Sequence, residues 1–127
     1  GSPNSRDDYI IDWLDAMRQL EYLSGRDVNV CFFGHSHRPS FFSEKGNSAP
    51  PEAHSIASLQ PNNRYFINPG AVGQPRDRDP RAAFGLFDLE KLTFEFGRVA
   101  YDIEKCAQEV IRAGLPSELA RRLAKGK

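Results

Sequence analysis

The spacing of apolar residues near the start of the chain predicts an amphipathic helix. Apolar side chains recur there every three or four residues, which places them on one helical face. Asp7 or Asp8 is positioned to cap the first turn, and Gly25 stands where a helix would end. The residues of the apolar face are Ile10, Ile11, Leu14, Met17, Leu20 and Leu23.

A nearly continuous apolar run follows this helix and predicts a strand that is covered on both faces. The run occupies residues 28–33. Further strands are expected at 39–43 and 64–67, and the polar segment 45–63 between them is expected to be a long loop or an insertion at a hairpin. A helix, a short turn and a buried strand in this order indicate a piece of an α/β layered fold.

The second half of the chain predicts a hairpin. Strands are expected at 82–89 and 92–100, with Glu90 and Lys91 in the tight turn between them. In the second of these strands, Leu92, Phe94, Phe96 and Arg98 alternate with Thr93, Glu95, Gly97 and Val99. This alternation predicts one buried face and one that is at least partly wet.

Helical spacing returns from Asp102 onward. Ile103, Ala107, Val110 and Ile111 share one face, and Gly114 is suited to end that helix. Pro116 is expected at the first position of a short last helix. The chain carries no internal repeat, so a single domain over residues 1–127 is the economical interpretation.

Composition narrows the classes of protein to consider. Lys plus Arg and Asp plus Glu each number 17, and this zero net charge disfavours a protein held to nucleic acid by bulk electrostatics. The local basic run 76–81 is interleaved with aspartates that cancel most of its field. No apolar stretch reaches the roughly 20 residues of a membrane span. No secretory leader is recognisable, and only Cys31 and Cys106 are present, so we expect a cytoplasmic protein with no nucleic-acid or membrane partner.

The most informative chemistry follows the first strand, at Gly34-His35-Ser36-His37. Two imidazoles two residues apart at a strand end can reach two neighbouring divalent metal ions. Such a pair of ions can bind a phosphate ester and activate the attacking water. Spacing alone leaves a second interpretation open, in which both histidines are simply hydrogen-bonded loop residues.

Other polar residues have both a structural and a functional interpretation. Asn68 lies in an Asn-Pro-Gly turn, which needs those residues for backbone reasons. Gln74 and Arg76 could contact a phosphate, because arginine is a preferred phosphate ligand. An ion-paired loop with the neighbouring aspartates is the alternative for this segment. His54 is expected to be a solvated side chain, and Cys31 a buried apolar residue rather than a nucleophile.

Five segments in a fixed order together resemble the small calcineurin-like metallophosphoesterases, in their bacterial and archaeal phosphodiesterase branch. They are GHSH at 34–37, INPGAVGQPRD at 67–77, DPRA at 79–82, AGLP at 113–116 and LARRL at 119–123. The resemblance implies a β-sandwich of two mixed sheets with helices on its outer faces. It also implies that this chain is the C-terminal half of such a domain, because the family's upstream metal-binding motifs are absent from the sequence.

The resemblance also assigns roles. His35 would bind one metal ion and His37 its neighbour, with a bridging hydroxide attacking phosphorus, and Asn68, Gln74 and Arg76 would be possible rim residues. The ions would be two of Mn, Fe, Zn, Ni or Mg. With its other ligands missing, this chain alone is expected to bind metal weakly or partially and to be inactive, and no residue of it is assigned a catalytic role. A non-catalytic binding or scaffold module with the same fold is the alternative function. The expected partners are a phosphate-ester substrate and either the missing N-terminal half or a second copy of the chain, which would cover the exposed sheet.

Overall fold

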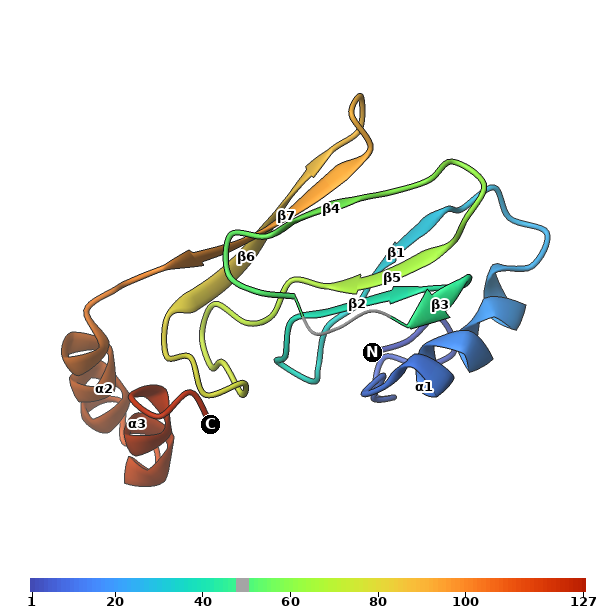
Figure 1. Ribbon diagram of the computed structural model, residues 1–127. Helices are drawn as coiled ribbons and strands as arrows, with labels where there is room; N and C mark the ends of the chain where they lie inside the picture. Colours follow the sequence, from blue (N-terminus) through green and yellow to red (C-terminus); the bar gives the residue numbers. More distant parts are fainter. Residues whose placement is uncertain (48–50) are drawn as a thin grey trace.

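A computed structural model describes residues 1–47 and 51–127, with the side chain of residue 47 left out (Figure 1). The first half contains helix α1 (Trp13–Arg18), the 3-10 helix η1 (Gln19–Leu23) and strands β1 (Val30–Phe32), β2 (Ser40–Ser43) and β3 (Gly46–Asn47). The second half contains β4 (Ile56–Ser58), β5 (Tyr65–Asn68), β6 (Ala82–Asp88), β7 (Thr93–Val99), α2 (Ile103–Arg112) and α3 (Ser117–Leu123).

The first sheet is mixed and has the strand order β1-β5-β2-β3. β1 runs parallel to β5, with Val30 opposite Tyr65, and β2 runs antiparallel to β5 on its other side. All four residues of β5 are buried. This central strand therefore contributes side chains to packing on both faces of the sheet.

The two faces of the first sheet pack against different layers. Alternate side chains of β5 point to opposite faces, and Phe66 joins a cluster with Ile10, Ala16, Leu23, Phe33 and Phe42 beneath α1. Tyr65 and Ile67 join the other cluster, with Leu59 and with Phe94 and Phe96 of β7. Trp13 also ties α1 to the sheet, because its Nε1 donates to the Ser43 carbonyl at 2.8 Å. The order of layers is helix, sheet, sheet.

The second sheet has the order β4-β7-β6, with both pairings antiparallel. Its centre depends on two glycines that face aromatic rings on the neighbouring strand. A Cβ at Gly85 would lie 2.0 Å from the Phe94 ring, and a Cβ at Gly97 would lie 2.3 Å from the Phe84 ring. Glycine is therefore required at both positions by the close approach of these rings.

A helical pair made of α2 and α3 lies beyond the end of β7, at one end of the molecule (Figure 1). Asp102 caps α2 by accepting from the Lys105 backbone N–H at 2.9 Å, and Gly114, with φ of 72°, follows its end. The segment after α3 returns to the sandwich, where the Gly126 carbonyl accepts from the Arg78 N–H at 2.9 Å. Across the described residues, no helix combines the length and the apolar character needed to cross a membrane.

The predicted fold class, a mixed α/β structure with two sheets and flanking helices, is confirmed. The elements predicted at 28–33, 39–43, 64–67, 82–89 and 92–100 correspond to β1, β2, β5, β6 and β7. The segment 45–63, expected as a long loop or an insertion at a hairpin, lies between the antiparallel partners β2 and β5 and contains β3 and β4. Residues 48–50 of that segment lie outside the described residues. β4 has only three residues and lies at the edge of the second sheet, with Ile56 exposed.

Helix ends also differ from the prediction. The first helix begins later than expected and is capped by Asp12, whose carboxylate accepts from the Asp15 N–H at 2.9 Å, and not by Asp7 or Asp8. Its second part is a 3-10 helix, and both Ile11 and Leu14 are exposed. Pro116 precedes α3 as its N-cap and is not its first helical residue.

Candidate metal centre

The loop that follows β1 holds its two histidines in an unusual backbone conformation. His35 has φ of 78° and His37 has φ of 58°, in the left-handed region that residues other than glycine rarely adopt. Each such residue costs on the order of 1–3 kcal/mol and persists only where the surroundings impose it. The contacts of this loop must therefore fix its shape.

One buried side chain from β5 fixes the middle of the loop. Asn68 has no exposed surface, and its Nδ2 donates to Ser36 Oγ at 2.9 Å, while its Oδ1 accepts from the Gly70 N–H at 2.9 Å. Ser36 is itself buried. A single amide thus joins the strand end, the histidine loop and the Asn-Pro-Gly turn, and it satisfies polar groups that burial would otherwise leave unpaired.

His37 is oriented by a neighbouring loop. Its Nδ1 lies 2.8 Å from the Gln74 carbonyl oxygen. A carbonyl can only accept, so Nδ1 must donate, and the neutral ring then carries its free lone pair on Nε2. The Arg76 N–H also donates to the His37 carbonyl at 3.1 Å. A histidine whose second nitrogen donates to a backbone carbonyl is the usual arrangement of a metal-ligating imidazole.

His35 is positioned by an aromatic contact. Its ring stacks on Tyr9, with centroids 4.0 Å apart and planes inclined by 29°. The side chain is exposed, whereas His37 is half-buried. Neither imidazole is packed into the interior, so the geometry leaves both available to ligands.

The donor set for a metal ion is incomplete. Among residues 1–47 and 51–127, no group of three or more His, Cys, Asp and Glu side chains is placed to hold a metal. The two histidines fit part of a centre, in which the Nε2 atom of His37 is the best-defined donor. His54, interpreted as solvated, is exposed.

The predicted rim residues occupy different positions around this loop. Asn68 lies beneath it as a buried tether, Gln74 contributes its backbone carbonyl to His37, and Arg76 is half-buried beside it. The structure thus brings all three together with the histidine loop. Sequence motifs could not predict the orientation of His37, because the atom that sets it is the backbone carbonyl of Gln74.

The loop carrying Gln74 is fixed by an ion network, as in the ion-paired alternative given for this segment, and the network includes Arg98 of β7, which the sequence interpretation did not single out. The Arg98 side chain from β7 is 6% exposed and pairs with the Asp77 carboxylate, and its Nη1 donates to the Arg81 carbonyl at 3.0 Å. Arg81 in turn pairs with Asp79 at 2.6 Å. That hydrogen bond lowers the pKa of Asp79 from 3.8 to about 2. The signal in the sequence was an arginine on the apolar face of an alternating strand.

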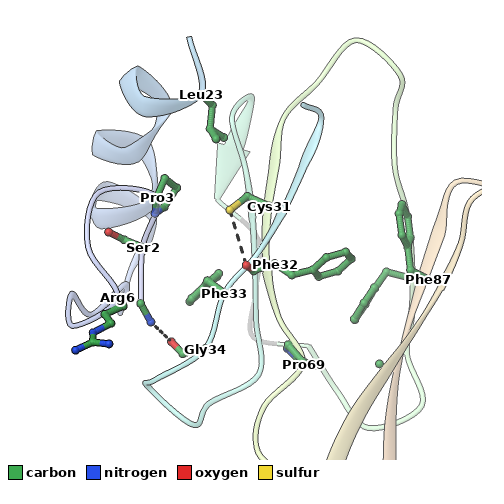
Figure 2. A pocket seen from close by; sticks show the side chains of 13 residues that line it. Ser2, Pro3, Arg6, Leu23, Cys31, Phe32, Phe33, Gly34, Pro69 and Phe87 are labelled. Atoms are coloured by element: carbon green, nitrogen blue, oxygen red, sulfur yellow. Dashed lines mark hydrogen bonds between the residues drawn. The ribbon is translucent and has the colours of Figure 1, made fainter. Parts of the chain in front are cut away.

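An apolar cleft of about 800 Å³ lies beside β1 (Figure 2). Phe32 and Phe33 line it from the first sheet, Phe87 and Phe94 line it from the second, and Gly1 to Pro3 form part of its wall. Phe32 is 50% exposed even though its ring contacts those of Phe87 and Phe94. Within the described strands, β1 pairs only with β5, so its other edge is open along this cleft.

Cys31 lines the same cleft and is half-buried. Burial raises the pKa of its thiol, which favours the protonated form. A protonated thiol is a poor nucleophile, and this agrees with the interpretation of Cys31 as a packing residue.

Comparisons with known proteins define the class to which this arrangement belongs. The model of the calcineurin-like phosphoesterase superfamily domain matches residues 12–92, and the chain belongs to this family. An uncharacterized protein of Methanocaldococcus jannaschii is 39% identical over 99 residues, which cover 78% of this chain and 40% of that protein.

Solved structures agree on the fold. A metallophosphoesterase from Sphaerobacter thermophilus superposes with a TM-score of 0.92 at 35% identity, over 100% of this chain and 53% of that one. A hypothetical protein from Pyrococcus horikoshii OT3 superposes with a TM-score of 0.71 at 21% identity, over 100% of this chain and 44% of that one, and shows likeness of fold alone. The chain therefore spans about half the length of the relatives it matches, or less.

Proposed function

We propose that this chain forms part of a metal-dependent phosphoesterase, a hydrolase of phosphodiesters or phosphomonoesters, in which His35 and His37 ligate two neighbouring divalent metal ions. The observation that carries the proposal is the hydrogen bond from His37 Nδ1 to the Gln74 carbonyl, because it directs the Nε2 lone pair outward from a fixed ring. Membership of the phosphoesterase family supports the same assignment.

The residues of this chain serve the reaction by placing ligands. Divalent ions bound there would supply Lewis-acid polarisation of the phosphate and lower the pKa of water. The Gln74 carbonyl orients His37, and Asn68 holds the loop between the two histidines through Ser36. Two neutral imidazoles offer no negative charge to offset the lost hydration of an ion, so we expect weak metal binding and no turnover by this chain alone.

The proposal includes a partner for the open cleft. Among the described strands, β1 pairs with β5 alone, and its other edge lies beside a cleft lined by Phe32, Phe87 and Phe94. Unpaired edges and apolar surfaces of this kind recruit further chain. The relatives carry about as much chain again as is matched here, or more. We therefore infer that the remaining half of a phosphoesterase domain occupies this cleft and supplies the remaining metal ligands, in a protein that acts in the cytoplasm.

The metal assignment is tested by binding, without reliance on activity. Co²⁺ is titrated into the 127-residue chain, and proton NMR follows the imidazole resonances of His35 and His37. His37→Ala is expected to remove the Co²⁺ binding that depends on His37. The matched control His54→Ala should leave the affinity for Co²⁺ unchanged, because His54 is exposed and lies outside the histidine loop. Equal losses in the two variants would contradict the assignment.

The partner is tested by complementation. The chain is mixed with the other half of the domain, prepared from a relative, and hydrolysis of a generic aryl phosphodiester is followed with Mn²⁺ present. Turnover is expected only in the mixture and is expected to disappear with His35→Ala or His37→Ala. Formation of a complex that binds Mn²⁺ without turnover would favour the non-catalytic scaffold. Sedimentation of the chain alone identifies the partner of the cleft. A dimer would indicate a second copy of the chain, whereas a monomer would leave the cleft for the other half of the domain.

A further inference from the structure

We propose that a small basic pocket beside the histidine loop is an oxyanion subsite that binds a phosphate group of the substrate. This inference rests on the proposed function and adds a recognition site to it. The pocket measures about 180 Å³. Ligand pockets usually measure roughly 300–1,000 Å³, so this one is sized for a single group of a ligand. Its lining residues are Tyr9, Ile11, Ser36, Arg38, Ser40 and Arg76.

The pocket adjoins the candidate metal centre through three contacts. Ser36 lies between the two histidines in sequence and lines the pocket. Tyr9, which also lines it, stacks on His35. The main chain of Arg76 donates to the His37 carbonyl at 3.1 Å. A group bound in the pocket would therefore sit directly against the loop that carries both imidazoles.

The two arginines of the pocket lack the carboxylate partners that neutralise their neighbours. In the part of the chain that the structure describes, no ion pair involves Arg38 or Arg76. The nearby aspartates are each paired with another arginine, Asp77 with Arg98 and Asp79 with Arg81, although the second carboxylate oxygen of Asp77, Oδ1, is buried without a hydrogen-bond partner. No carboxylate lines the pocket. The positive charge of the two guanidinium groups is thus left for an external anion.

One donor in this pair has no acceptor. Arg76 Nε is buried and makes no hydrogen bond. A buried donor without a partner is costly, which makes each such group in a folded protein a candidate for an unseen ligand. An oxyanion in the pocket would supply the acceptor, and guanidinium is the side chain best matched to phosphate oxygens.

The Arg38 side chain is also held in place before any ligand arrives. Arg38 Nε donates to the Arg76 carbonyl at 3.0 Å, which orients the Arg38 guanidinium and joins the two residues. The Ser40 hydroxyl donates to the Arg38 carbonyl at 3.2 Å. A guanidinium fixed in this way loses less conformational entropy on binding an anion than a free surface arginine would.

The test uses inorganic phosphate and the metal-free 127-residue chain in the presence of a chelator. Amide NMR shifts are expected to centre on residues 36, 38 and 76. Arg76→Gln and Arg38→Gln are each expected to weaken phosphate binding by about tenfold, because each removes a charge-assisted hydrogen-bond donor. Arg38 is exposed, so its variant keeps the test valid even if Arg76→Gln disturbs the loop.

Controls separate this proposal from general electrostatics and from the metal assignment. Arg26→Gln removes one exposed charge outside the pocket and should leave binding unchanged; an equal loss there would overturn the subsite. His37→Ala should remove the share of metal binding that depends on His37, and it should leave phosphate binding by the metal-free chain unchanged. If His37→Ala loses phosphate binding as well as metal binding, the subsite is overturned. If metal binding is unchanged in every histidine variant, only the proposed metal centre is overturned.

Addition of Mn²⁺ distinguishes two sources of the bound phosphate. A phosphate group that is also the one hydrolysed would contact the metal, so its ³¹P signal would broaden strongly in the wild type and not in His37→Ala. A second phosphate group of the substrate would broaden less and bind independently of the metal. Absence of any phosphate binding at residues 36, 38 and 76 overturns the proposal.

Discussion

The end of β1 and the open edge of β1 are organised in opposite ways. At its end, the histidine loop is fixed by polar contacts from Asn68 and Gln74, which supply partners to the Ser36 hydroxyl and the His37 ring. Along its edge, Phe32 is half exposed over an apolar cleft with no strand beyond it among the described residues. The histidine loop at the end of β1 is thus preorganised, whereas the apolar edge of β1 is left partly exposed.

This difference separates what the chain can form by itself from what it requires from elsewhere. The geometry of the ligands is set within this chain, by hydrogen bonds that join the histidine loop to the end of β5 and to the loop carrying Gln74. The chain does not close its hydrophobic interior by itself, because the apolar surface beside β1 remains exposed to solvent. Metal ligands can be prepared in advance by such local bonds, whereas affinity for the ion awaits the missing donors.

The largest expected effect contrasts two phenylalanines on either side of this division. Phe66→Ala should lower the free energy of unfolding by about 3–5 kcal/mol, because the ring is fully buried beneath α1. Phe32→Ala should lower it by less than about 1 kcal/mol in the isolated chain, since half of that residue is already exposed. Urea denaturation measures both. Similar losses would mean that the edge of β1 is already part of a closed core.

The second effect concerns the polar tether. Asn68→Ala should lower the free energy of unfolding by about 2 kcal/mol, because it removes two hydrogen bonds and leaves the buried Ser36 hydroxyl without this partner. Asn62→Ala, at an exposed position, is the matched control and should change stability by less than about 0.5 kcal/mol. In addition, Asn68→Ala should weaken Co²⁺ binding. Unchanged binding would show that the loop keeps its shape without the tether.

The smallest effect is a dependence of stability on pH. The hydrogen bond from Arg81 holds the pKa of Asp79 at about 2, below its ordinary 3.8. The unfolded state therefore binds the proton more tightly. The contribution of this ion pair to the free energy of unfolding is complete above about pH 4 and is lost as the pH falls toward 2. Asp79→Asn should remove that part of the pH dependence in acid denaturation curves. Arg81→Gln should have a similar effect, and a profile identical to wild type in both would refute the role of this pair.

Much of the fold was accessible from the pattern of apolar residues. β5 and β7 are strongly patterned, and both were expected with nearly the observed bounds. β3 and β4 were missed because they have only two and three residues, too few to show a pattern, and β4 pairs with a strand distant in sequence. The late start of α1 reflects competition between several aspartates for the cap, which only tertiary packing decides.

The candidate site was accessible in part. The two histidines stood out by their spacing, and membership of the phosphoesterase family agrees with the resemblance carried by GHSH and INPGAVGQPRD. The tautomer of His37 depends on a backbone oxygen 37 residues away, which no residue pattern records. The neutralisation of Asp77 by Arg98 likewise joins a loop to a strand across the fold. Interactions of this kind depend on topology rather than on local sequence.

The left-handed backbone at His35 and His37 has a consequence for how this segment evolves. Glycine adopts such torsions without steric cost, so a chain selected only for thermal robustness would tolerate glycine at both positions. The imidazoles stand at two positions where the backbone conformation disfavours any side chain. Laboratory selection for heat resistance, with no demand for chemistry, is expected to erode this motif before it erodes the neighbouring sheet.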